Sequence, residues 1–321
     1  MVSAAIRLFS IIMIVLLGYF GGNHPGEQSQ RQGTDSLPMA KLIPASATMQ
    51  RAWEVPRNPI EDSILQGSYL GDEIRFGFRL FTNTSHEAPQ FSGNALSCSN
   101  CHLNAGQREK ALPLVGVAGM FPEYNKRAGR LFTIEDRVVE CFKRSIDAAK
   151  FETVPRAEVE KNPGPTSQSR EVLAISAYIA WLSAGYPAGK QIPWRGQNVI
   201  PSKNLVPIEK LDPKRGEKLY KERCTNCHGE DGQGVEIGDK KAGPLWGEQS
   251  WNDGAGAARV YTLAGMIRYT MPYLDPGSLS DEEAQQIAAF INSKTRPEFP
   301  FKNSDYRGET IPSDAVYYKS K

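Results

Sequence analysis

The sequence lacks two features that would place it in common classes of protein. It has only five cysteines in 321 residues, and four of them stand in two short motifs, so no pairs remain for a disulfide framework. Its formal net charge is only +2, which excludes the strong basic field expected of a nucleic-acid binder. The chain is nevertheless long enough for two domains, and its 40% hydrophobic content is sufficient to form their cores.

The sequence also lacks an apolar run long enough to span a membrane, but it has a shorter one near its start. Residues 8–20 are uncharged and apolar, and they follow Arg7. Such a run suits the hydrophobic region of a signal peptide better than a spanning helix of about 20 residues. No clear small-residue cleavage pattern follows, so an uncleaved membrane anchor is the alternative. We therefore expect a periplasmic protein, free or tethered to the inner membrane, with a signal peptide or anchor at 1–22 and a flexible linker at 23–50.

Two five-residue motifs account for four of the cysteines. They read C-S-N-C-H and C-T-N-C-H. This pattern is the attachment signature of c-type haem, in which two thiols bond to the haem and the adjacent histidine binds the iron. A zinc site would need four ligands where each motif offers three, and a redox dithiol rarely has a histidine directly after it. The motifs therefore predict two covalent haem c groups, held by Cys98, Cys101, His102, Cys224, Cys227 and His228.

The flanks of the two motifs form a weak internal repeat. A predicted helix precedes each motif, a Pro-Leu pair follows it, and a helix with apolar residues at helical spacing closes each half, at 171–182 and at 281–291. The second of these helices is predicted to start with a capping box, with Ser280 as N-cap and Glu283 at N3. Pro113 and Pro244 are expected to offer carbonyl acceptors to the ring N–H of the two histidines. These features predict a mostly α-helical protein with two tandem class I cytochrome c domains. We expect the first domain at 51–190, a linker at 191–210, the second domain at 211–297 and an extended tail at 298–321.

Each haem iron has a sixth coordination position, and the second half offers a clear ligand for it. Met271 precedes Pro272 and lies 43 residues after His228. A methionine before a proline, late in the domain, is the expected distal ligand of a small cytochrome c. Met266 is the alternative, but its neighbours indicate a buried helix residue. Ligation by histidine and methionine raises the haem potential, which suits an electron exit.

The first half has no Met-Pro pair. Met120 lies only 18 residues after His102, whereas Cys141 lies 39 residues after it, close to the offset of Met271. A cysteine at that place would bind iron as a thiolate and lower its potential. The alternative is a buried free cysteine that packs as a small hydrophobic residue.

The surroundings of Cys141 favour the iron ligand. A helix is predicted to start at Thr133 as N-cap, with Asp136 three residues on, and to run to about Lys150. Arg137 then shares the face of Cys141.

Basic residues also outnumber acidic residues by three between positions 125 and 150. Such a charge excess is usually a solvated helix face. Here it would place a redox sulfur beside fixed guanidinium groups, which is what recognition of a sulfur-containing anion requires.

Longer stretches around these residues carry a family resemblance. In the first half they are L-S-C-S-N-C-H-L-N-A-G, F-P-E-Y-N-K-R-A-G-R and T-I-E-D-R-V-V-E-C-F-K-R-S, and in the second half G-P-L-W-G, S-W-N-D-G-A-G-A-A-R and T-M-P. Over about residues 50–297 the chain resembles the dihaem thiosulfate dehydrogenase family. The resemblance implies an enzyme that couples two thiosulfates to tetrathionate and releases two electrons, with tetrathionate reduction as the reverse reaction.

The resemblance also implies a role for individual residues. In the first domain, which would be catalytic, it implies that His102 and Cys141 bind the iron. In the second domain, which would transfer electrons, it implies that His228 and Met271 bind the iron. It also implies that the substrate is bound by Arg127, Arg137 and Ser145. Two departures stand out. The family often continues after R-S into a small N-G-like turn, whereas this chain has I-D-A-A-K. Some members carry a lysine beside the distal methionine, where this chain has Thr270.

The implied partners are thiosulfate or tetrathionate as substrate and a c-type cytochrome, soluble or membrane-bound, or another high-potential acceptor for the electrons. No nucleic-acid partner is expected. Two other functions stay open at this point. A plain dihaem electron carrier would need no arginines beside a thiolate, and a subunit resembling the SoxA cytochromes would need a partner that carries a bound sulfane group.

Overall fold

A computed structural model describes residues 39–45, 54–153, 164–238 and 240–318. The predicted signal peptide or anchor and most of the predicted linker after it lie outside these residues. No helix in the described part of the chain is long and apolar enough to cross a membrane. Residues from 38 onward form one unit by their contacts.

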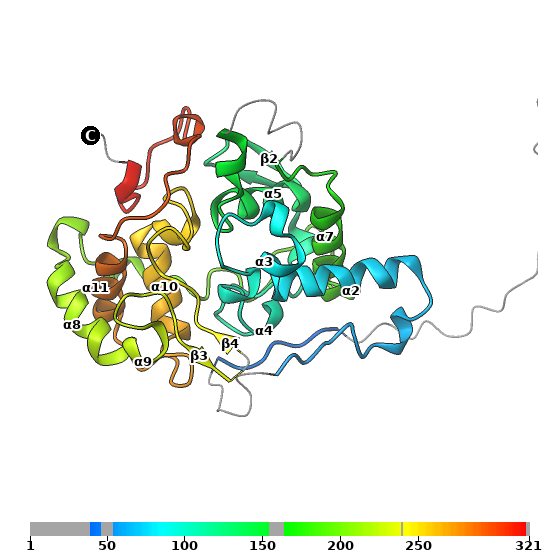
Figure 1. The fold of residues 1–321 in the computed structure, drawn as a ribbon, viewed down its shortest axis with the longest axis horizontal. Coiled ribbons are helices and arrows are strands. Elements are labelled where there is room, and N and C mark those ends of the chain that lie inside the picture. The colour runs from blue at the N-terminus through cyan, green and yellow to red at the C-terminus, as the bar shows by residue number, and fades with distance from the viewer. Residues whose placement is uncertain (1–38, 46–53, 154–163, 239, 319–321) are drawn as a thin grey trace, which may run out of the picture. The chain divides into compact units, whose positions relative to one another are not determined.

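The described residues are mostly helical, as the sequence predicts (Figure 1). The α-helices are α2 (Tyr69–Thr82), α3 (Thr84–Glu87), α4 (Leu103–Gly106), α5 (Ile134–Arg144), α7 (Arg170–Leu182), α8 (Pro213–Arg223), α9 (Thr225–His228), α10 (Val260–Thr270) and α11 (Asp281–Ile291). The strands form two short antiparallel hairpins, β1 (Glu123–Asn125) with β2 (Arg130–Phe132) and β3 (Glu236–Ile237) with β4 (Lys240–Lys241). Short 3-10 helices, among them Cys98–Asn100, Ala148–Thr153, Lys302–Ser304 and Val316–Tyr318, occupy parts of the connections.

In the first half, α2 packs across α7, and α5 packs on α7 as well. The side chain of Ser68 caps the start of α2 by accepting from the amide of Gly71. Close approach of the two helices requires a glycine on α2, because a Cβ at Gly77 would lie 1.9 Å from the carbonyl oxygen of Ala174. The crossing therefore brings the helix before the first motif onto the helix that closes this half.

The second half repeats this crossing with α8 on α11, and α10 packs on α11 beside it (Figure 1). Here a Cβ at Gly216 would lie 2.0 Å from the carbonyl oxygen of Gln286. The predicted capping box of α11 is confirmed, because Ser280 and Glu283 each bond to the other's backbone amide. The internal repeat read from the sequence is thus a repeated helix crossing.

The predicted helix around Cys141 is confirmed at its start and ends earlier than predicted. Thr133 caps α5 with the expected capping box. The sequence predicts a helix to about Lys150, but α5 ends at Arg144. The amides of the next two residues both bond to the carbonyl of Cys141, and Asp147 then takes a left-handed backbone with φ 57°. This turn ends the helical hydrogen bonds six residues before the predicted end of the helix.

Polar side chains join the two halves at the end of α5. The buried amide of Asn94 donates to the carbonyl of Ser145 at 2.8 Å and to that of Ser250 at 3.0 Å. The fully buried Asn252 donates to the carboxylate of Asp147 at 2.8 Å. The loop that contains Ser250 and Asn252, part of the S-W-N-D-G stretch, therefore positions the end of α5.

The C-terminal segment differs from the extended tail predicted at 298–321. Its described part contains two 3-10 helices and packs against both halves. Asp305 accepts two hydrogen bonds of 2.7 Å from Arg144 of the first half, and Asp314 pairs with Arg259 of the second half at 2.7 Å. These carboxylates meet arginines that are far away in the sequence, which is why a local reading of the segment misses its packing.

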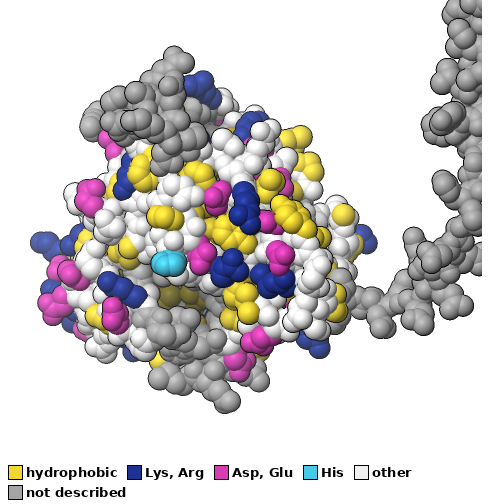
Figure 2. Space-filling model, turned by 45° about the vertical axis from the view of Figure 1, so that its right-hand side comes forward, with side chains coloured by type: hydrophobic (Ala, Val, Ile, Leu, Met, Phe, Trp, Pro, Cys, Tyr) yellow, Lys and Arg dark blue, Asp and Glu magenta, His cyan; other side chains and the backbone are white. Residues whose placement is uncertain are grey.

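Charge on the surface is mixed rather than of one sign. On the face that Figure 2 shows, lysine and arginine side chains lie among acidic and hydrophobic ones.

Candidate haem sites and a cationic cavity

The first motif presents a neutral histidine with one free ring nitrogen. His102 follows the 3-10 turn of Cys98–Asn100, and its Nδ1 lies 2.6 Å from the carbonyl oxygen of Leu112. The pKa of His102 is lowered to about 4, mainly because the ring is buried. The hydrogen bond to the Leu112 carbonyl raises this pKa, and the positive charge of Arg137 lowers it further. With Nδ1–H donating to Leu112, Nε2 carries the lone pair that a metal would bind.

The acceptor predicted for His102 is off by one residue, whereas the acceptor predicted for His228 stays a prediction. In the first site the acceptor is Leu112 and not Pro113. Leu112 has a left-handed backbone with φ 51°, and this turn brings its own carbonyl to the ring. In the second site Nδ1 of His228 is buried without a hydrogen bond to a described residue. Burial lowers the pKa of His228 and the backbone of Gly243, the residue before Pro244, opposes the shift.

Three sulfur atoms gather at the first motif. Burial raises the pKa of Cys98 to about 12 and that of Cys101 to about 11, and the nearby sulfur of Cys141 adds to both shifts. Helix α5 therefore brings Cys141 to the motif from 39 positions beyond His102. Cys141 itself is half-buried.

The second motif has a similar pair of thiols and a candidate sulfur ligand. Burial raises the pKa of Cys224 to about 12, and Cys227 adds to the shift. Met271 lies directly after α10 and packs half-buried against the core, whereas Met266 lies inside that helix. Met120, the alternative for the first site, belongs to a 3-10 helix, and its sulfur lies 3.9 Å from the guanidinium of Arg195.

These donor sets fit haem c better than zinc. Each motif supplies two thiols for covalent attachment and one neutral histidine for the iron. Among the described residues, no group of three His, Cys, Asp or Glu side chains is placed to hold a bare metal ion. A haem iron needs only one or two protein ligands, because the porphyrin supplies the other four.

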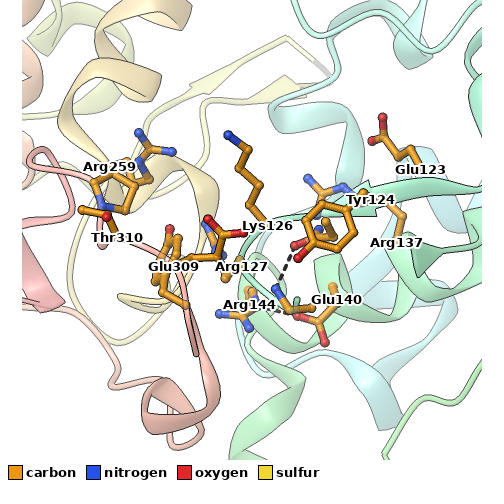
Figure 3. A pocket seen from close by; sticks show the side chains of 14 residues that line it. Glu123, Tyr124, Lys126, Arg127, Arg137, Glu140, Arg144, Arg259, Glu309 and Thr310 are labelled. Atoms are coloured by element: carbon orange, nitrogen blue, oxygen red, sulfur yellow. Dashed lines mark hydrogen bonds and ion pairs between the residues drawn. The ribbon is translucent and has the colours of Figure 1, made fainter. Parts of the chain in front are cut away.

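Beside α5 lies a cavity of about 690 Å³ that is rich in cations, here called the cationic cavity (Figure 3). The basic residues that line it are Lys126, Arg127, Arg137, Arg144 and Arg259. They come from the loop between β1 and β2, from α5, and from the start of α10. Three carboxylates, Glu123, Glu140 and Glu309, also line it, so the cations exceed the anions by two.

The five cations differ in how far they are already engaged. Arg144 is buried and bonds to Glu140 at 2.6 Å and to Asp305 at 2.7 Å. Although burial opposes its charge, these two carboxylates raise the pKa of Arg144. Within the described part of the chain, Arg137 and Lys126 form no ion pair, and both are exposed. They are therefore available to an anion.

Arg127 is held in place from the second half and from the C-terminal segment. Its Nη1 donates to the carbonyl of Gly254 at 2.5 Å, and its own carbonyl accepts from the amide of Tyr306 at 2.8 Å. Its guanidinium also lies 5.8 Å from the centre of the Tyr306 ring. A fixed guanidinium of this kind can orient a bound anion with little loss of side-chain entropy.

The structure brings some of the predicted substrate-binding residues together and leaves one outside. Arg127 and Arg137 both line the cationic cavity, while Cys141 lies at the first motif. The pKa shift of His102 shows that the charge of Arg137 reaches the motif from the cavity side. Ser145 caps the end of α5 and does not line the cavity.

Other residues of the cavity were missed by the sequence reading. Arg259 ends the stretch S-W-N-D-G-A-G-A-A-R, which carried the family resemblance without a role for this arginine. Tyr306, Glu309 and Thr310 come from the segment predicted to be a tail. Nothing in the local sequence of that segment signals a contribution to a binding site.

Comparison with known proteins gives the same division into two cytochromes. The family described as SoxA/TsdA, cytochrome c domain, matches residues 86–188, and the family described as cytochrome c oxidase, cbb3-type, subunit III, matches residues 211–291.

Curated relatives and a solved structure share most of the chain. A thiosulfate dehydrogenase of Allochromatium vinosum is 38% identical over 249 residues, 76% of this chain and 85% of that protein. One of Stutzerimonas stutzeri is 34% identical over 243 residues, 75% of this chain and 73% of that protein. The solved structure of thiosulfate dehydrogenase TsdBA from Marichromatium purpuratum matches this chain with a TM-score of 0.63 and 34% sequence identity. The match covers 73% of this chain and 48% of the TsdBA chain, so this chain spans about half of that longer protein. The chain therefore belongs to the thiosulfate dehydrogenase family and consists of two cytochrome c domains, each with one covalently attached haem c.

Proposed function

We propose that this protein is a thiosulfate dehydrogenase that joins two thiosulfate ions into one tetrathionate ion. The reaction forms one S–S bond and releases two electrons, 2 S₂O₃²⁻ → S₄O₆²⁻ + 2 e⁻, and no proton or water is consumed. The relatives of similar length are named thiosulfate dehydrogenases, which supports the proposal. The same site would catalyse the reverse reaction if a donor of low potential supplied electrons.

The cationic cavity beside α5, the helix that contains Cys141, is the observation that carries this proposal. Two dianions repel each other strongly, and a half-dry site without cations would not hold them together. The exposed side chains of Arg137 and Lys126, which pair with no described residue, and the fixed guanidinium of Arg127 would offset this repulsion. A plain electron carrier has no need of such a cavity.

We propose the following roles for the residues of the two haem sites. Cys98 and Cys101 would attach the first haem, with His102 and the thiolate of Cys141 as iron ligands. Cys224 and Cys227 would attach the second haem, with His228 and Met271 as iron ligands. When bound, the two haems would each accept one of the two electrons.

Within the first site, Arg127 and Arg137 would bind the thiosulfate ions and hold them on the cavity side of Cys141. The hydroxyl of Ser145 would act from the end of α5, one turn beyond Cys141. Pro113 and Pro244 would shape the turns that carry Leu112 and Gly243 to the histidine rings.

The electrons would leave to a c-type cytochrome, soluble or membrane-bound, or to another high-potential acceptor. We also propose a periplasmic location, because covalent haem c and an N-terminal apolar run fit an exported protein. The segment 1–22 would be its signal peptide or its anchor in the inner membrane.

The test uses the haem-loaded chain alone, with an artificial electron acceptor and thiosulfate. We expect acceptor reduction that depends on thiosulfate, with one tetrathionate formed for every two electrons. A chain with both haems but without activity in either direction would favour a plain electron carrier. Activity only with an added protein that carries a sulfane group would favour a subunit similar to SoxA.

A further inference from the structure

Among the described residues, Arg108 is the largest fully buried side chain, with none of its surface exposed. One of its guanidinium nitrogens, Nη2, donates to the carbonyls of Tyr273 at 3.0 Å and Ala45 at 3.3 Å. The other two, Nε and Nη1, are buried and form no hydrogen bond with a described residue. Arg108 also has no ion pair in the described part of the chain. A buried guanidinium with unused donors is costly unless an anion or another acceptor meets them.

The position of Arg108 connects the two haem sites. It lies in the loop that leaves His102 through α4 and returns to the same histidine at Leu112. Its guanidinium stacks on the ring of Tyr273, 4.4 Å from the ring centre. Tyr273 stands two residues after Met271. Arg108 therefore links the loop behind the first haem to the segment that carries the proposed distal ligand of the second.

The ligand that fits this place is a carboxylate. Thiosulfate from solution is an unsuitable partner, because Arg108 is enclosed and does not line the cationic cavity. Tyr273 partly offsets the lowering of the Arg108 pKa that burial causes, but it supplies no negative charge. Each haem carries two propionate carboxylates at its edge, and these anions accompany the cofactor into the protein.

We propose that Arg108 binds a propionate of one of the two haems at the junction of the two cytochrome domains. Its donors would fix the edge of that haem, and its charge would stabilise the reduced state. Arg108 is then a positioning residue for electron transfer. The inference depends on the two haem c groups and not on the identity of the substrate.

The first test compares Arg108→Gln with the unaltered chain, both with two haems attached. The two reduction potentials are measured by spectroscopic titration, in which the thiolate-ligated and the methionine-ligated haem are followed by their different absorption bands. We expect the potential of one haem to fall by about 59 mV, which corresponds to a tenfold change in a one-electron equilibrium constant. The haem that shifts is the source of the propionate. Arg108→Lys, which keeps the charge but has fewer donors, should shift the same potential by less.

Arg57→Gln is the matched control. Arg57 also stacks on an aromatic ring, 4.0 Å from the ring centre of Trp181, and donates to the carbonyl of the same residue at 2.7 Å. It has no buried donor without a partner, so its loss should leave both potentials unchanged.

A second measurement decides the matter even if Arg108→Gln does not fold. A crystal structure of the haem-loaded chain should place a propionate oxygen within hydrogen-bond distance of Nε or Nη1 of Arg108. Bonds from these atoms only to water or to the backbone would overturn the proposal. Unchanged potentials of both haems in a folded Arg108→Gln chain would overturn it as well.

Discussion

Cys141 is the residue at which the two parts of the first site meet. Its sulfur is close enough to Cys98 and Cys101 to raise their pKa, and four residues before it on α5 Arg137 faces the cationic cavity. In the proposed function, Arg137 binds the anion while the sulfur of Cys141 lies at the haem motif. This arrangement makes the contribution of each residue separable by mutation.

Cys141→Ala should keep both haems and lose thiosulfate turnover. Haem attachment depends on the thiols of the two motifs, which this change leaves intact. We expect the rate to fall by a factor on the order of 10²–10³, the usual cost of removing a group that acts in the transition state. Haem content and turnover are measured on the same preparation. Met120→Ala is the control, and an equal loss there would point to Met120 as the ligand.

Arg137→Gln should weaken both thiosulfate binding and the chemical step. Arg137 is an exposed, unpaired cation of the cavity, and its loss leaves the repulsion between two dianions less well offset. We expect kcat/KM to fall by about 100-fold. Arg130→Gln is the matched control, because Arg130 is paired with Asp136 at 2.9 Å and does not line the cavity. Equal losses in the two variants would contradict a specific role for Arg137.

Asp147→Asn should stabilise the protein in a pH-dependent way. Burial raises the pKa of Asp147 from its ordinary value of 3.8 to about 6, although the bond from Asn252 opposes this. The fold therefore favours the protonated form, and stability is lost as pH rises from about 4 to about 6. Asparagine removes that loss and tolerates the left-handed backbone at this position.

The expected gain from Asp147→Asn is on the order of 1–3 kcal/mol at pH 7.5 and about half of that at pH 5. Unfolding by denaturant at the two pH values measures it. A gain that does not change with pH would mean that the charge of Asp147 is not its cause.

At the scale of elements, the end of α5 is held by the C-terminal segment. Asp305 accepts both hydrogen bonds of the Arg144 fork, and the next residue, Tyr306, bonds to the backbone of Arg127. Tyr318 donates to the same carboxylate. The segment therefore closes one side of the cationic cavity and fixes two of its arginines.

Asp305→Asn should destabilise the fold and reduce activity together. The change leaves the buried Arg144 with Glu140 as its only carboxylate in the described part of the chain. Breaking a buried pair costs about 3–5 kcal/mol. Unfolding free energy and kcat/KM are measured side by side. The control is Glu298→Gln, which breaks an exposed pair with Lys302 at 3.2 Å and should cost no more than about 1 kcal/mol. Full activity in a destabilised Asp305→Asn chain would show that the C-terminal segment stabilises the fold but does not contribute to the activity of the site.

At the scale of the whole molecule, the proposed function divides the reaction between the two domains. The cationic cavity lies beside α5 of the first domain and is also lined by Arg259 and the C-terminal segment, whereas Met271 follows α10 in the second domain. If the second domain only passes electrons on, its variants should leave the chemistry of the first domain unchanged.

Met271→Ala should slow electron exit without slowing thiosulfate oxidation. Loss of a methionine ligand lowers the potential of the second haem and makes it a poorer acceptor. In rapid mixing experiments, thiosulfate should reduce the first haem at the unaltered rate, while electron transfer to the external acceptor becomes rate-limiting. Met266→Leu, which changes a methionine inside α10, is the control. A variant whose slow step remained the chemistry would contradict the proposed role of Met271.

Much of the fold was predictable because its signals are local. Apolar residues at helical spacing predicted α7 and α11 nearly to the residue, and the capping boxes at Thr133 and Ser280 have the expected bonds. The end of α5 was predicted six residues late, since the left-handed turn at Asp147 depends on its bond to Asn252 in the other domain. The domain boundaries at 190 and 211 remain predictions.

The sequence by itself determined the class of this protein, because the haem motifs, the helix caps and the family stretches each lie within a few consecutive residues. It also named Arg127 and Arg137, which the structure brings to one cavity. Only the tertiary structure decided that the carbonyl of Leu112 meets His102, that the C-terminal segment lines the cavity, and that Arg108 is buried with two donors that bond to no described residue. These features arise from contacts between residues as far apart as Arg144 and Asp305, and such contacts leave no periodic pattern along the chain.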